Sequence, residues 1–172
     1  KEGALIEEDV GAVKKGEVMA YAYDNDGDNL YEVVVAQPGG VKANANSGYW
    51  LNGANQLAEI NLKYLDTSNT TNMQYMFANC KSLTRIDASS FNTKNVTAMN
   101  HMFAVCTNLK TVDLSSFNTE KVTTIWRCFS GCSSLQSLTI PFVGGSKTAT
   151  SESSSTLFGY IFGTSSYTGS TS

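Results

Sequence analysis

Apolar residues recur along the middle of the chain at a fixed interval of 26 residues. The interval separates three phenylalanines, three cysteines and three leucines: Phe77, Phe103 and Phe129; Cys80, Cys106 and Cys132; Leu83, Leu109 and Leu135. A constant period of this length is typical of repeat proteins, in which each copy buries the apolar side of its neighbour. The pattern therefore divides the middle of the chain into four copies, residues 47–72, 73–98, 99–124 and 125–140.

Two local patterns follow one another within each copy. The first places apolar residues at i, i+3, i+4 and i+7, and its members in the second copy are Met73, Met76, Phe77 and Cys80. This spacing predicts a short α-helix with one apolar face. The second pattern, at residues 83–89 and their equivalents, has Leu followed by apolar residues three and five positions later. It predicts a short strand with one buried side, paired in parallel with its copies about 4.8 Å apart.

Together the two patterns predict an α/β fold, a right-handed solenoid in which each copy contributes one short helix and one short parallel strand. The side chains that alternate with the buried strand positions would form a continuous outward face. We take this outward face as the candidate binding surface. Its members are Glu59 and Asn61; Thr84, Arg85 and Asp87; Lys110, Thr111 and Asp113; and Gln136, Ser137 and Thr139.

The repeat resembles a known family of bacterial surface sequences. Residues 95–119, NVTAMNHMFAVCTNLKTVDLSSFNT, are similar to BspA-like surface repeats, in particular to the variant of mycoplasma-type surface lipoproteins. Residues 67–93 are also similar, with Thr70 in place of the usual Val and Ala88 in place of Leu. The resemblance extends over residues 47–140 and implies a secreted or cell-surface bacterial protein that contacts host or bacterial partners.

The strand pattern also resembles leucine-rich repeats, which implies a leucine-rich-repeat-like solenoid. The standard form has Asn or Cys shortly after the strand, where this chain has Phe91 and Phe117. Residues 139–167 resemble an insertion that is usually followed by further repeats. We therefore expect a fragment of a longer protein in which the repeat array continues.

The two ends of the chain depart from the period. Residues 1–46 are expected to form a β-rich N-terminal cap, because two β-rich runs flank the turn signal DNDGDN within residues 17–36. Residues 1–16 could form a short helix or a frayed arm. Residues 141–172 are rich in Ser, Thr and Gly and are expected to be an insertion or a truncated C-terminal segment. Their apolar cluster at 157–162 is expected to fold over the last copy.

Composition narrows the classes of partner. The chain has 172 residues, 41% of them hydrophobic, and a net charge of −3 without a basic stripe, which argues against nucleic acid as a partner. No apolar run reaches the length of about 18 residues that a transmembrane helix needs. The chain begins with Lys1 and has no signal peptide ahead of it, which again favours an excised piece.

All four cysteines, Cys80, Cys106, Cys128 and Cys132, occupy apolar positions of the repeat. Buried cysteine behaves as a small hydrophobic residue, so core packing is the first expectation. A disulfide remains open, because an extracellular setting would permit it. A zinc site is disfavoured, because the pair formed by Cys128 and Cys132 lacks a second pair of ligands.

The acidic turn and the single histidine are the other candidates for chemistry. Asp24, Asp26 and Asp28 could bind calcium, but Gly27 comes before the position that an EF-hand requires, so a turn is favoured. His101 occupies a position away from the predicted apolar face, and an exposed bystander is expected.

Asp87 and Asp113 would be neighbours across two copies, and we expect them to bind backbone or water rather than to act as acid and base. The sequence offers no nucleophile, base or metal set, so no enzyme, metal site or cofactor is expected. We expect a non-catalytic, extracellular or cell-surface module that binds proteins or mediates adhesion. The alternative is a passive stalk that displays another domain.

Overall fold

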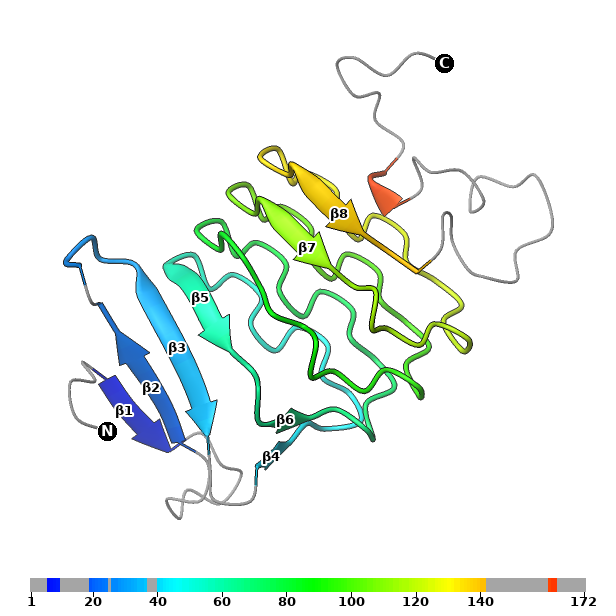
Figure 1. The fold of residues 1–172 in the computed structure, drawn as a ribbon, viewed down its shortest axis with the longest axis horizontal. Coiled ribbons are helices and arrows are strands. Elements are labelled where there is room, and N and C mark those ends of the chain that lie inside the picture. Colours follow the sequence, from blue (N-terminus) through cyan, green and yellow to red (C-terminus); the bar gives the residue numbers. More distant parts are fainter. Residues whose placement is uncertain (1–5, 10–18, 25, 37–39, 142–160, 164–172) are drawn as a thin grey trace.

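The computed structural model describes residues 6–9, 19–24, 26–36, 40–141 and 161–163. The described residues form β-strands in small sheets, joined by turns (Figure 1). The largest sheet has the order β1-β2-β3-β5, with β1 at Ile6–Asp9, β2 at Met19–Tyr23, β3 at Tyr31–Ala36 and β5 at Leu57–Asn61. Two pairs complete the set: β4 (Val41–Lys42) with β6 (Leu65–Asp66), and β7 (Thr111–Asp113) with β8 (Ser137–Thr139).

The N-terminal strands extend the sheet of the first copy. β2 and β3 pair in antiparallel register, with Tyr23 opposite Glu32, which confirms the hairpin predicted around the DNDGDN turn. β3 then pairs in parallel with β5 of the first copy. Residues 6–9 are strand β1, neither the helix nor the frayed arm that the sequence left open. The hairpin is thus joined to the repeats by backbone pairing.

The copies stack as layers, which we number one to four in sequence order. Phe77 N–H donates to Met102 O at 2.9 Å, and Phe103 N–H donates to Cys128 O at the same distance. The ring of Phe103 stacks on Phe77 and on Phe129, with centroids 5.5 Å apart and interplanar angles of 4° and 6°. All three rings are fully buried. The prediction that these phenylalanines lie in register in a common core is confirmed.

The predicted helix is wrong, because no α-helix forms among the described residues. In layer two, Tyr75 and Asn79 have φ angles of 57° and 60°, in the left-handed region that a right-handed helix excludes. Met76 N–H and Ala78 N–H donate to carbonyls three residues earlier, at 3.3 and 3.1 Å. The i, i+3, i+4, i+7 spacing therefore arises from consecutive tight turns.

Hydrogen bonding between layers explains the difference. Tyr75 N–H donates to Asn100 O at 3.0 Å, and Asn79 N–H donates to Ala104 O at 2.7 Å, both in the next layer. A helix would direct these amides to carbonyls of its own segment. The predicted α/β class is therefore corrected, and with it the right-handed, leucine-rich-repeat-like solenoid of helix plus strand. The described residues form small β-sheets, and turns connect the strands within and between the copies.

Strand formation within the layers follows the sequence only in part. β7 and β8 pair in parallel, and Arg85 forms an isolated parallel bridge with Thr111. Parallel pairing at the predicted strand positions is thus confirmed. Layer two has only the single bridge residue where a strand is predicted. Thr84 N–H of layer two still donates to Ala58 O of β5 at 3.1 Å, so the layers are bonded here without a regular strand.

A short C-terminal segment, residues 161–163, covers the last layer, and we call it the lid. Phe129 N–H donates to Ile161 O at 2.8 Å, so Ile161 takes the role that the next layer plays elsewhere. Its side chain is only 1% exposed, and Phe162 packs on Phe129 with ring centroids 6.2 Å apart. The predicted folding of the 157–162 cluster over the last copy is confirmed for these two residues, while residues 157–160 lie outside the described residues.

Each layer has two left-handed positions, and the second of them gives a test of the turns. The equivalent residues are Gly53, Asn79, Val105 and Gly131, all with positive φ. Val105 is β-branched and 37% exposed, so it carries backbone strain without burying much of its side chain. We expect Val105→Asn to stabilise the fold by about 1 kcal/mol, because Asn tolerates this conformation far better than valine.

Denaturant unfolding of Val105→Asn against wild type measures this gain. The matched control is Thr111→Asn in β7, at an exposed strand position, where no gain is expected because Asn is disfavoured in strands. Equal midpoints for wild type and Val105→Asn would contradict the strain argument.

Candidate functional site

The structure places the eleven predicted binding residues on the surface. Nine of them are exposed, and Glu59 and Thr84 are half-buried. They alternate with Ile60, Ile86 and Val112, which are buried. Strand register aligns them in rows across the layers. The rows contain Arg85, Thr111 and Ser137, and Asp113 with Thr139.

Asn61, Asp87 and Asp113 occupy equivalent positions in layers one to three, and each side chain accepts a hydrogen bond from the backbone two residues further along. Asp87 Oδ1 accepts a hydrogen bond from Ser89 N–H at 3.0 Å, and Asp113 Oδ1 accepts one from Ser115 N–H at 2.8 Å. Asn61 makes the same contact in layer one. The hydrogen bonds from Ser89 and Ser115 lower the pKa of the two aspartates. The expectation that Asp87 and Asp113 bind backbone is confirmed, and both carboxylates are ionised at neutral pH.

An ion pair links layers one and two on this face. Arg85 Nε donates to Glu59 Oε1 at 2.8 Å, and Arg85 Nη2 donates to Oε2 at 2.6 Å. The side chains are 70% and 37% exposed. A surface pair of this kind adds little stability, about 0–1 kcal/mol. Its geometry nevertheless fixes the direction of both charged groups.

A hollow of about 750 Å³ lies at the N-terminal end of the outward face. Tyr23 and Glu32 line it from the hairpin, together with residues of β5 and of layer two. The register places Glu32 beside Glu59, so β3 extends the rows of the face by one strand. The sequence prediction missed this contribution. The run of valines in YEVVVA marks β3 as a strand, but its parallel pairing with β5 leaves no local signal.

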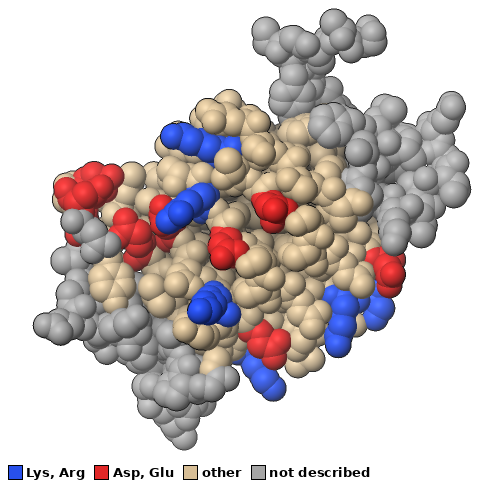
Figure 2. All heavy atoms as spheres, in the orientation of Figure 1, with Lys and Arg blue, Asp and Glu red and all other residues tan. Residues whose placement is uncertain are grey.

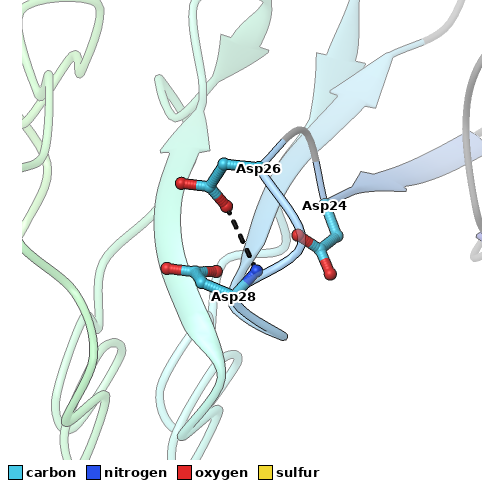
Figure 3. A group of neighbouring side chains, drawn as sticks. All are labelled: Asp24, Asp26 and Asp28. Carbon is cyan, nitrogen blue, oxygen red and sulfur yellow. Dashed lines mark hydrogen bonds between the residues drawn. The ribbon is translucent and has the colours of Figure 1, made fainter.

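Charged side chains of both signs gather on this side of the molecule. Figure 2, in the orientation of Figure 1, shows acidic and basic groups interspersed over the strands, with an acidic group at the tip of the β2–β3 hairpin. The tip carries Asp24, Asp26 and Asp28 (Figure 3). A partner for this surface therefore has to match a pattern of charge rather than a single sign.

The hairpin tip is a turn, as the sequence predicts. Asp24 Oδ1 accepts from Gly27 N–H at 2.7 Å, and Asp28 Oδ1 accepts from Leu30 N–H at 2.8 Å. Asp26 accepts from Asp28 N–H, the contact drawn in Figure 3. Carboxylate oxygens of the three aspartates lie within 4.8 Å of one another, so a divalent cation is the metal that they could hold. The hydrogen bonds account for the arrangement without an ion.

Comparison with known sequences gives a family match over the repeats. Residues 47–156, more than half of the chain, match the family described as Mycoplasma protein of unknown function, DUF285. The chain belongs to the DUF285 family. No curated protein and no solved structure matches it. The DUF285 match begins with the first copy and extends past the fourth, so the matched region contains all four copies.

The cysteines of the DUF285 region pack in the core. Cys80, Cys106 and Cys128 are fully buried, Cys132 is half-buried, and all four are free thiols. Cys106 Sγ–H donates to Phe77 O at 3.1 Å, and the equivalent cysteines make the same contact with the preceding layer. Burial raises the pKa of Cys80 and of Cys132 to about 11. The core-packing expectation is confirmed, and the thiols are protonated at neutral pH.

His101 differs from its prediction. It is half-buried rather than an exposed bystander, and its ring stacks on Tyr75 at 4.4 Å and meets the edge of Trp126 at 5.1 Å. The predicted helix put this position on the solvent side, whereas the turn brings the rings of adjacent layers together.

Across the described residues, no helix has the length and hydrophobicity to cross a bilayer.

Proposed function

We propose that this DUF285 chain is a non-catalytic module that binds a protein partner at a bacterial surface through its outward face. The observation that supports the proposal best is the hollow beside the ion pair of Glu59 and Arg85. Exposed groups of both signs, of which Arg85, Asp87 and Asp113 make hydrogen bonds within the face, favour a partner with complementary charges. Several strands contribute to the surface, which suits a polypeptide better than a small molecule.

The chemistry of the titratable groups supports a non-catalytic role. Catalytic acids and nucleophiles have pKa values near the working pH. Asp87 and Asp113 have lowered pKa values because the hydroxyl and amide of Ser89 and the amide and hydroxyl of Ser115 stabilise their charge. Burial raises the pKa of each cysteine, so the thiolate that a nucleophile requires is scarce.

The surface location rests on the resemblance of residues 95–119 to BspA-like surface repeats. A secreted or displayed position would give the outward face access to host or bacterial proteins. The in-register bonds between layers also favour a second role, a passive spacer that holds another domain away from the cell. A spacer needs rigid stacking but no specific side chains on the outward face.

Attachment of the purified chain to cultured epithelial cells tests the binding role. The variant Arg85→Glu/Asp87→Lys keeps the net charge and reverses two of the charges on the outward face. We expect it to attach at least about tenfold more weakly than wild type, which corresponds to about 1.4 kcal/mol. Saturation binding with a fluorescent label measures the affinity, and thermal unfolding checks the fold.

The matched control is Lys81→Glu/Glu120→Lys, two exposed residues outside the outward face, whose reversal also keeps the net charge. We expect its attachment to equal that of wild type. Equal attachment of both variants would remove the outward face as the binding site. If wild type itself fails to attach, the spacer role is favoured instead.

A further inference from the structure

A column of rings runs along the turn side of the layers. It contains Tyr49, Tyr75 and His101, one per layer, and the equivalent residue of layer four is Arg127. All four have positive φ. Tyr49 stacks on Tyr75 at 4.7 Å, and Tyr75 stacks on His101 at 4.4 Å, with interplanar angles of 10° and 6°. Parallel stacking therefore continues through the first three layers.

The column changes at the junction between layers three and four. Trp126 meets His101 edge-on at 84°, and the Arg127 guanidinium lies over the Trp126 ring, with Cζ 4.4 Å from its centroid. The charged group of layer four is thus held by an aromatic face rather than by a carboxylate. It lies on the same side of the molecule as His101.

The polar atoms at this junction lack partners. His101 Nδ1 and Arg127 Nε are both buried, and neither has a hydrogen-bond partner among the described residues. In the neutral imidazole one nitrogen is an acceptor, and leaving it without a hydrogen bond costs a moderate amount of folding free energy. A protonated imidazole would place an N–H donor and a positive charge there, which is more costly because no acceptor is at hand.

The charged and titratable groups that face His101 do not compensate for a proton. Layer two contributes the Tyr75 ring, and layer four contributes Trp126 and Arg127. The ion pair of the described residues, between Arg85 and Glu59, lies elsewhere. Burial, followed by the charge of Arg127, lowers the pKa of His101 from its usual 6.5. The neutral form is therefore the one that fits the folded junction.

The lid connects this junction to the end of the stack. A Cβ atom on Gly163 would lie 3.4 Å from Arg127 Cγ and from Arg127 Nε, so the lid backbone lies against the arginine side chain. Phe129, two residues further along, is bonded to Ile161 of the lid. A displacement of Arg127 therefore acts on the contact that closes layer four.

We propose that His101 is an acid-sensitive latch, whose protonation loosens layer four and the lid while the first layers stay closed. Protonated His101 and Arg127 would repel each other across a junction where the described residues form no ion pair. The device requires only the stacked geometry, the buried nitrogen and the neighbouring cation. It is independent of the proposed binding role of the outward face.

The direction of the pH effect follows from linkage. The folded pKa of His101 lies below that of the unfolded chain, so the unfolded state binds the proton first. The stability that neutral His101 contributes is complete above about pH 6.5 and is lost as the pH falls through the folded pKa. Carboxylates stay largely ionised between pH 7.5 and 5.5, so among the side chains it is the histidine that changes its charge in this window.

Hydrogen exchange and NMR on the full chain test the latch. His101 is the single histidine, so its imidazole signal is unambiguous, and we expect it to titrate below pH 6.5. The Phe129 amide, which donates to the lid, should lose protection by about threefold or more between pH 7.5 and 5.5, after correction for the intrinsic rate. The Leu51 amide, which donates to Met76 O in layer two, should keep its protection.

Two variants separate the latch from general acid sensitivity. His101→Tyr restores the ring found at the equivalent positions of layers one and two, and it should abolish the pH dependence at Phe129. Arg127→Gln removes the facing charge and should move the His101 pKa towards 6.5. The proposal is overturned if His101→Tyr keeps the wild-type pH dependence, or if His101 of wild type titrates at or above pH 6.5.

Discussion

Replacing Phe103 with alanine is expected to destabilise the fold by about 3–5 kcal/mol. Its ring is the middle member of the phenylalanine column and contacts a ring on each face, at 5.5 Å from both neighbours. The substitution removes a fully buried side chain and two aromatic contacts, each worth about 0.5–1.5 kcal/mol beyond the area they bury. The stacked layers leave little freedom for the core to collapse into the space.

Urea unfolding monitored by circular dichroism measures the loss for Phe103→Ala. The matched control is Tyr64→Ala, an aromatic residue that is 53% exposed, where a change within about 0.5 kcal/mol is expected. A loss below about 1 kcal/mol for Phe103→Ala would show that the column is not the core of the fold.

Truncating Ile161 to alanine is expected to cost about 2–4 kcal/mol, concentrated at layer four. Ile161 is 1% exposed, and its carbonyl accepts the amide that the fourth layer would otherwise donate to another copy. Removing most of the side chain weakens the lid without removing this backbone bond. Phe129 of layer four then loses part of the apolar side chain that covers it.

Hydrogen exchange resolves where the loss of Ile161 acts. The Phe129 amide should exchange faster in Ile161→Ala, while the Tyr75 amide, which donates to Asn100 O, should change little. Ile140→Ala is the control, because Ile140 is only half-buried and its truncation should cost less. Equal costs for the two truncations would mean that residues 161–163 do not close the stack.

The sequence predicts the repeat and its core well, because the signal is carried by spacing. Phe77, Phe103 and Phe129 stack in register, and the cysteines pack beside them. A 26-residue period can be satisfied by any fold that stacks equal units, so it predicts which residues meet without specifying the backbone between them.

The local backbone is where prediction failed. The apolar spacing of Met73, Met76 and Phe77 is the same for one face of a helix and for consecutive turns that point inwards. Tyr75 and Val105 are poor choices for the left-handed region, so the sequence gives no warning of it. Only the bonds between layers show why the turns are preferred, and these bonds are a tertiary property.

The candidate site shows a similar division. Alternation along the strands placed Arg85, Asp87 and Asp113 at the surface, where the structure has them. The hollow could not be predicted, because it depends on β3 pairing in parallel with β5. Whether the outward face binds a partner stays a prediction.

The bonds that join the layers run along the axis of the stack, from Leu51 through Phe77 and Phe103 towards the lid. A pull between the two ends would therefore load the interfaces in series, so that the weakest opens first, rather than shear many bonds at once. Such a body yields stepwise under tension, starting at its weakest junction, and each released layer lengthens the chain while the remainder holds. A molecule built in this way would absorb mechanical work gradually instead of failing in a single event.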